Sequence, residues 1–269
     1  MTHMKTLAML FATAMVALTA CKKDVKTSAD AISQETLTKI SDLGFSTMNV
    51  QKISQGYLVE GDIILTDEQL NEQPASPLLR IANEEQYHTF NLVTGLPRTI
   101  NVTLSAGAPQ WFVDATKEAV LRYHNQSLTL DFQYNNSQGA SATINIVTFY
   151  EQSNTLGSSG FPSSSGNPYP TVNLNTYWYD ASTDINYLAT IIAHEIGHCI
   201  GFRHTDYMSR RYSCGIGGNE GQAKNGVGAV LIPGTPSGPD AASWMLACIG
   251  EGVNRPFNAN DVTALQYLY

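Results

Sequence analysis

Basic residues are scarce in this chain of 269 residues, which carries 15 Lys and Arg against 23 Asp and Glu. The formal net charge is therefore −8. Proteins that bind nucleic acid neutralise its phosphates with clustered Lys and Arg, so this balance argues against nucleic acid as a partner. Charged residues of both signs make up only 14% of the chain, whereas hydrophobic residues make up 43%, which is enough for one sizeable core.

Cysteine is also scarce, with four positions in the whole chain. No Cys lies between Cys21 and Cys199, so no thiol from that stretch can serve as a metal ligand. If Cys21 carries lipid, then Cys199, Cys214 and Cys248 remain, and at most one intramolecular disulfide can form among them. The residues alone leave open which pair that is.

Long hydrophobic runs are missing beyond the N-terminus, so no later segment is predicted to cross a membrane. Lys5 precedes an apolar run to Val16, which is too short for a stable membrane-spanning anchor and leads into LTAC at residues 18–21. This ending resembles the lipobox of bacterial lipoproteins, in which the Cys is acylated. We predict that residues 1–21 are a lipoprotein signal peptide with Cys21 as the lipidation site; an ordinary cleaved signal is the alternative. The expected location is the bacterial cell envelope or surface, with the lipid held in the outer membrane.

The order of the predicted elements indicates an α+β fold, a sheet with helices packed on it. Alternation at period two predicts strands, and apolar residues three or four apart predict helices. The predicted strands are residues 57–65 with a break at Gly61, 99–104, 128–134, 142–150 and 171–175. The predicted helices are residues 35–43, 67–70, 113–123, 188–202 and 260–268. Residues 153–170 are rich in Gly, Ser, Asn and Pro and are predicted to be loop.

His194 and His198 stand four residues apart on the predicted helix 188–202. This spacing puts both imidazoles on one helix face, one turn apart, where they can converge on a single ion. Zinc suits such neutral imidazole nitrogens. Glu195 projects to the side of the same face, so we expect it to hold a zinc-activated water rather than to ligate the metal.

The third candidate ligand, His204, cannot lie on that helix face. It is 204 − 194 = 10 residues beyond His194, and a continuing helix would point it about 80° away. Gly201 stands where the chain has to turn, because Gly adopts a positive φ readily and ends helices. His88 and His124 are expected to be surface or core residues. No fourth protein ligand is evident nearby, which favours an open catalytic zinc site over a closed structural one.

The residues HEIGHCIGFRH at positions 194–204 resemble the zinc signature of the metzincin peptidases. With Thr205 and Asp206 they look like the dual-action HEIGH metallopeptidase family. Metzincins also carry a turn with a Met beneath the metal, and Met245, which follows Ser and Trp 41 residues after His204 (245 − 204 = 41), is similar to it. The resemblance covers about residues 97–269. It implies a metzincin-like domain with a mixed twisted β-sheet, a long zinc-binding active-site helix, a Met-turn and a C-terminal helix.

The resemblance carries further implications for the cysteines and for the transition state. It implies a disulfide between Cys214 and Cys248, with Cys199 buried and reduced. Some metzincins place a Tyr near the metal two residues after the Met, but Ala247 stands at that position here. Stabilisation of the transition state is therefore left to zinc, to backbone groups, or to another side chain such as Tyr207 or Tyr212.

The predicted function is that of a zinc-dependent endopeptidase, which hydrolyses peptide bonds with a zinc-activated water and Glu195 as general base. One catalytic Zn²⁺ is the expected cofactor, and calcium is left open as a second ion. A protein or peptide is the expected substrate, paired as an extended strand with residues 172–174 at the upper edge of the cleft.

Two other functions are open besides a peptidase. One is a non-enzymatic surface lipoprotein with a structural zinc site that binds a partner or a glycan. Glu195 argues against it, because a structural site has no use for a general base. The other is a zinc hydrolase that acts on a non-peptide amide.

Residues 22–96 are predicted to be a tether followed by a prosegment-like region, and residues 97–269 the catalytic domain. An inhibitory prosegment is one reading of this region, with an acidic ligand such as Asp62 or Asp67 directed at the zinc. A spacer between the lipid and the enzyme is the other reading.

Overall fold

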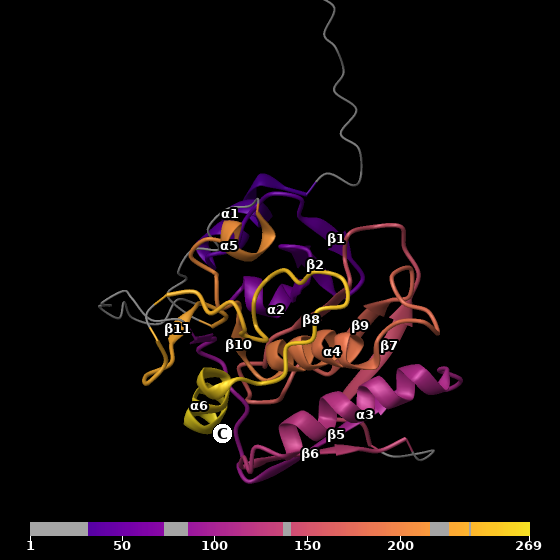
Figure 1. The fold of residues 1–269 in the computed structure, drawn as a ribbon. Coiled ribbons are helices and arrows are strands. Elements are labelled where there is room, and N and C mark those ends of the chain that lie inside the picture. Colours follow the sequence, from indigo (N-terminus) through magenta and orange to yellow (C-terminus); the bar gives the residue numbers. More distant parts are fainter. Residues whose placement is uncertain (1–31, 73–85, 137–140, 216–225, 237) are drawn as a thin grey trace, which may run out of the picture. The chain divides into compact units, whose positions relative to one another are not determined.

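The computed structural model describes residues 32–72, 86–136, 141–215, 226–236 and 238–269, of which 32–269 belong to one compact unit (Figure 1). The predicted signal peptide and the lipidation site Cys21 lie outside the described residues. Within the described residues, no helix has both the length and the hydropathy that crossing a membrane requires.

An eight-stranded sheet organises the unit, in the spatial order β1-β2-β3-β8-β9-β7-β5-β6. Strands β6, β5, β7 and β9 run parallel to one another, and β8 runs antiparallel to β9. At the far end β3 pairs in parallel with β8, while β2 pairs antiparallel with both β1 and β3. The strands span Gln51–Ile53 (β1), Gly56–Val59 (β2), Ile63–Leu65 (β3), Arg98–Leu104 (β5), Leu130–Tyr134 (β6), Ile144–Phe149 (β7), Gly157–Gly160 (β8) and Thr171–Asn175 (β9).

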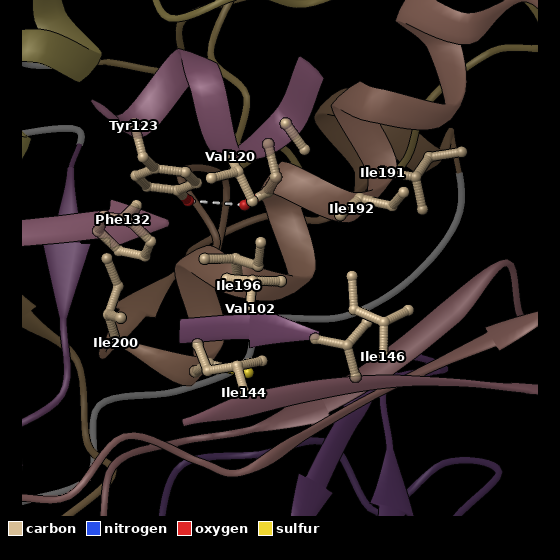
Figure 2. Close-up of a cluster of buried hydrophobic side chains, with 14 of the residues drawn as sticks. Val102, Val120, Tyr123, Phe132, Ile144, Ile146, Ile191, Ile192, Ile196 and Ile200 are labelled. Carbon is tan, nitrogen blue, oxygen red and sulfur yellow. Dashed lines mark hydrogen bonds between the residues drawn. The ribbon is translucent and has the colours of Figure 1, made fainter. Parts of the chain in front are cut away.

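The main core lies between this sheet and two helices, α3 (Gln110–His124) and α4 (Ile185–Cys199), which pack against each other. Figure 2 shows side chains of both helices meeting Val102 of β5 and Ile146 of β7. The hydroxyl of Tyr123 on α3 donates to the backbone oxygen of Ala193 on α4 at 2.7 Å, which satisfies a buried polar group within the core. The predicted α+β fold with a mixed sheet, a long helix carrying the metal signature and a C-terminal helix is confirmed.

Helix α4 begins and ends where its local sequence allows. Asp184 caps its N-terminus by accepting from the Tyr187 backbone N–H at 2.9 Å. The helix ends at Cys199, three residues before the predicted end, because Gly201 adopts φ +109° and turns the chain. The chain then enters a small three-stranded sheet of β10 (Phe202–Arg203), β4 (Tyr87–His88) and β11 (Val230–Leu231).

The C-terminal helix α6 (Ala259–Leu268) has Asn258 as its N-cap. Asn258 accepts from the Asp261 backbone N–H at 3.0 Å, and the Asp261 carboxylate accepts from the Asn258 backbone N–H at 3.0 Å. This reciprocal capping box satisfies donors that a helix start otherwise leaves unpaired. One further short helix, α5 (Arg211–Cys214), follows the third candidate ligand along the chain.

The prediction that residues 153–170 are loop is wrong for Gly157–Gly160, which form β8. All four residues are buried, and the strand is held by tertiary context rather than by strand propensity. A Cβ at Gly157 would lie 2.9 Å from Glu195 Oε1, and one at Gly160 would lie 2.7 Å from the Tyr169 ring. Glycine is therefore needed at both ends of β8, and that composition hides the strand from sequence reasoning.

Strand β8 also changes where the edge of the cleft lies. The sequence predicts residues 172–174 of β9 as that edge, but β9 lies inside the sheet between β8 and β7. The prediction is wrong because β8, which it treats as loop, covers β9 on the side toward the cleft.

Residues 32–72 form α1 (Gln34–Asp42), strands β1 to β3 and α2 (Asp67–Leu70), and they join the same sheet. Most of their apolar side chains pack with one another in a second core. That core consists of Ile40, Leu43, Phe45, Tyr57, Val59, Ile63, Leu65 and Leu70, with Phe161 and Val227 from the rest of the chain.

Candidate metal centre and cleft

Three imidazoles from α4 and the turn after it converge on one point. His194 and His198 lie one helical turn apart, and their Nε2 atoms are 3.1 Å from each other. The turn at Gly201 brings His204 back beneath the helix, so that its Nε2 lies 3.2 Å from Nε2 of His198. All three side chains are buried or nearly so. His88 and His124 lie outside this cluster, as the sequence reasoning expected.

Backbone carbonyls fix the orientation of two of the rings. Nδ1 of His194 lies 2.8 Å from the Trp244 oxygen, and Nδ1 of His198 lies 2.8 Å from the Phe202 oxygen. A carbonyl only accepts, so each Nδ1 carries the proton and each Nε2 presents a lone pair to the cluster. Lone pairs of neighbouring imidazoles repel each other unless a cation lies between them.

The cluster fits a zinc ion. A tetrahedral zinc with Zn–N distances of about 2.0–2.1 Å holds its nitrogens about 3.3 Å apart, close to the separations seen here. Burial, with His194 and His204 close by, lowers the pKa of His198 well below its ordinary value, which favours the neutral form that binds metal.

Glu195 is buried beside the cluster and is not one of its candidate ligands. The hydroxyl of Ser159 on β8 donates to Glu195 Oε2 at 2.7 Å and orients the carboxylate. Burial, helped by the negative charge of Asp62, raises the pKa of Glu195 well above its ordinary value, although the Ser159 hydrogen bond opposes the shift. Sequence reasoning missed Ser159, because nothing near it in the chain signals a strand under the site.

A fourth candidate ligand, Asp62, reaches the cluster from the turn between β2 and β3. Its Oδ2 lies 3.0 Å from Nε2 of His204 and 3.8 Å from Nε2 of His194. Burial raises the pKa of Asp62, but the two histidines and Arg210 outweigh it and hold that pKa well below its ordinary value. Asp67, the other acidic candidate, is exposed on α2 and is not in the cluster.

The Met-containing turn lies directly beneath α4. Met245 is fully buried, and its backbone oxygen accepts from the Thr205 N–H at 2.9 Å. A Cβ at Gly197 would lie 2.6 Å from the Met245 sulfur, so the Gly of the HEIGH string makes room for this side chain. Trp244, next to Met245, supplies the carbonyl that orients His194.

Asp206 and a disulfide tie the loop after His204 to this turn. Asp206 accepts from the Ala247 N–H at 3.0 Å and from the Ser213 hydroxyl at 2.6 Å. A disulfide joins Cys214 to Cys248, the pair that the family resemblance implies, and Cys199 is a free, buried thiol. Asp206 belongs to the sequence motif, but the motif alone did not indicate that its carboxylate holds this loop against the turn.

A cleft of about 660 Å³ opens on the cluster. Its walls include residues of β8, of α4 and of the chain after Met245, as well as the β2–β3 turn. Of the described residues that line it, none is Tyr207 or Tyr212, the two tyrosines considered for stabilising the transition state. Tyr207 is buried and its ring contacts that of Tyr87, whereas Tyr212 is largely exposed.

This α+β fold has two histidines and a buried Glu on one helix and a third histidine after the turn that follows it, all beside a cleft, which is the arrangement of a metallopeptidase. The model of the dual-action HEIGH metallopeptidase family matches residues 57–269, and the chain belongs to that family. It is therefore a metallopeptidase by family, and zinc is the ion that the family implies.

Among solved structures the chain is similar to two of myroilysin. One is 20% identical over 43% of this chain and 48% of that chain, with a TM-score of 0.33. The other is 17% identical over 66% and 82%, with a TM-score of 0.43. High choriolytic enzyme 1, a hatching-enzyme zinc-protease from Oryzias latipes (medaka fish), is 16% identical over 39% and 44%, with a TM-score of 0.26. The chain thus spans less than half of the first and third of these. No curated protein matches it in sequence.

Proposed function

We propose that the chain is a zinc-dependent endopeptidase, with His194, His198 and His204 as the protein ligands and Glu195 as the general base. The observation that carries this proposal is the buried carboxylate of Glu195, held by Ser159 beside three converging Nε2 atoms. A cleft of about 660 Å³ is large enough for several residues of an extended peptide.

Zinc, when bound, supplies Lewis acidity, which acidifies water and polarises a scissile carbonyl. Glu195 takes the proton of the attacking water at its carboxylate and passes it to the leaving amine. Ser159 keeps the carboxylate aimed at the cleft through its hydrogen bond.

The second candidate is a surface protein with a structural zinc site, and one observation favours it. The carboxylate of Asp62 lies where a fourth ligand is expected, and structural zinc sites have four protein ligands. The buried Glu195 favours the enzyme, because a closed structural site gains nothing from a second buried carboxylate nearby.

The proposal is tested by replacing Glu195 with Gln, which keeps the shape and removes the base. We expect Glu195→Gln to lower peptide hydrolysis by roughly 10²–10⁴-fold while the protein still binds one zinc per chain. Hydrolysis of a peptide library is measured with two forms of the protein, the intact chain and the chain cut by limited trypsin treatment. The trypsin is blocked with a serine-protease inhibitor before the library is added. A zinc chelator should abolish the remaining cleavage.

Glu35→Gln serves as the matched control, because Glu35 is exposed on α1 and its ion pair among the described residues is with Lys39, one turn on. It should leave hydrolysis unchanged. Wild-type rates in Glu195→Gln would rule out this mechanism. A zinc-loaded chain that cleaves nothing in either form would favour the structural-site alternative.

We also propose that the protein is exported and held at the bacterial surface through a lipidated Cys21. The proposal rests on the apolar run and the LTAC string at residues 18–21. A lipid anchor needs no membrane-spanning helix, because each buried methylene contributes about 0.8 kcal/mol of membrane affinity.

A further inference from the structure

The turn between β2 and β3 occupies part of the cleft, and it is aimed at the metal cluster. Glu60, Gly61 and Asp62 all line the cleft. One oxygen of Asp62, Oδ2, faces the histidines, and the other, Oδ1, is buried without a hydrogen-bond partner among the described residues. A buried carboxylate with an unsatisfied oxygen is costly unless a cation compensates it. Both oxygens of Asp62 thus point to a cation at this place.

The turn is fastened to the rest of the chain through three successive backbone carbonyls. The Glu60 oxygen accepts from Arg210 Nη2 at 2.7 Å, and the Gly61 oxygen accepts from the Thr155 hydroxyl at 2.9 Å. The Asp62 oxygen accepts from the Ser159 N–H at 2.9 Å. Glu60 and Gly61 have φ of +59° and +97°, a tight turn that non-glycine residues rarely adopt. The backbone is thus held in a costly conformation that delivers Asp62 to the cluster.

Strand β3 blocks the sheet edge next to the site. Ile63 and Ile64 pair in parallel with Ser159 and Gly160 of β8, the strand that also orients Glu195. The other side of β8 is already paired with β9. An extended peptide that binds by adding a strand needs a free edge, so it can pair with β8 only after β3 has left.

The packing of residues 32–72 allows this segment to separate from the rest of the chain as one unit. Except for Phe161 and Val227, the described buried residues of the second core come from this segment. They are Ile40, Leu43, Phe45, Tyr57, Val59, Ile63, Leu65 and Leu70. Leu58 and Ile64 instead join the main core. Most of the segment's apolar side chains therefore keep their contacts with one another when β3 separates from β8, and the apolar cost of separation falls mainly on Leu58, Ile64 and the partners Phe161 and Val227.

We propose that this β2–β3 hairpin is a built-in inhibitor, in which Asp62 supplies the fourth ligand to the zinc and β3 fills the edge where substrate pairs. The inference rests on the proposed peptidase function and names its regulation. Activation would withdraw the Asp62 carboxylate from the three histidines and free the edge of β8. No covalent bond changes in this step, because the hairpin only moves away.

The test uses the full chain loaded with Co²⁺ in place of zinc, because the visible absorption of Co²⁺ reports the number and kind of its ligands. Asp62→Asn is nearly the same shape and removes the anionic ligand. We expect it to change the Co²⁺ spectrum. In the zinc form we expect it to raise peptide hydrolysis by the uncut chain about tenfold or more. Asp67→Asn, the same change on an exposed helix residue five positions on, should alter neither quantity.

A second variant tests the hydrogen bond that holds the β2–β3 turn in place and leaves Asp62 and the three histidines unchanged. Thr155→Val removes the hydroxyl that holds the Gly61 carbonyl, and it should also raise hydrolysis by the uncut chain. An unchanged spectrum and unchanged hydrolysis in Asp62→Asn, in a chain that does cleave peptides, overturns the inference and leaves the peptidase proposal standing.

Two further outcomes separate this inference from the proposed function. If no form of the chain cleaves peptides, including the trypsin-treated one, the peptidase proposal and the inhibitory role fail together, while the spectrum still decides whether Asp62 is a ligand. If Asp62→Asn loses its metal and gains no hydrolysis, Asp62 is a permanent ligand of a closed site, and the inhibitor is ruled out.

Discussion

At the scale of single residues, the metal cluster depends on where one backbone turn falls. Gly201 has φ +109°, and its N–H bonds to the His198 oxygen at 2.9 Å. A Cβ there would lie 2.9 Å from Leu92 Cδ2 and 3.1 Å from Thr89 Oγ1, so both the backbone angle and the packing require glycine. The same turn at Gly201 therefore both ends the helix and places His204 beside the other two histidines.

Gly201→Ala is expected to destabilise the fold by roughly 1–3 kcal/mol and to weaken zinc binding, because relief of the strain displaces His204. The measurements are denaturant unfolding with and without chelator and competitive zinc titration. Gly215→Ala is the matched control, since Gly215 has φ +70° and no atom of the described residues lies within 4 Å of its Cβ position. It should cost stability through strain alone and leave zinc affinity unchanged. Equal zinc affinity in wild type and Gly201→Ala would contradict this account.

At the scale of elements, the loop after His204 and the Met-turn behave as one brace under the cluster. Asp206 connects them through hydrogen bonds, and the Cys214–Cys248 disulfide closes a loop with a sequence separation of 34. Cross-linking a loop of this length removes conformational freedom mainly from the unfolded chain. The brace is therefore expected to stabilise the fold.

Replacing both Cys214 and Cys248 with Ser should lower the free energy of unfolding by roughly 2–4 kcal/mol. Thermal or denaturant unfolding measures the loss. A thiol reductant should destabilise the wild type toward the double variant and leave the double variant itself unaffected, since its remaining described Cys is buried and free. A double variant as stable as the oxidised wild type would show that the cross-link adds nothing.

Sequence reasoning succeeded for elements whose signal is local and failed where partners are remote. The α4 motif is visible because its three histidines lie within one helix and one turn, and α6 is visible because Asn258 and Asp261 form a capping box. Strand β8 is invisible because its Gly and Ser residues are set by Glu195 and Tyr169 elsewhere in the chain. The approach of Asp62 to His204 spans 142 residues, so the sequence could only name it beside Asp67.

At the scale of the whole molecule, the described unit follows residues 1–21, which the sequence predicts to be a lipoprotein signal peptide. If Cys21 carries lipid, the wild-type protein should fractionate with membranes and take up a labelled fatty acid. Cys21→Ser should lose both properties, while its zinc content, which depends on residues far along the chain, stays the same. Labelling of Cys21→Ser at the wild-type level would exclude this anchoring site.

The close approach of Met245 to Gly197 limits which side chains can stand together at these two positions. The sulfur of Met245 lies 2.6 Å from the place that a Cβ at position 197 would take, although the two residues are 245 − 197 = 48 positions apart. Any side chain at position 197 therefore needs a smaller or differently directed one at position 245. The helix that carries His194 and His198 and the turn beneath it therefore fit together only as a sterically matched pair.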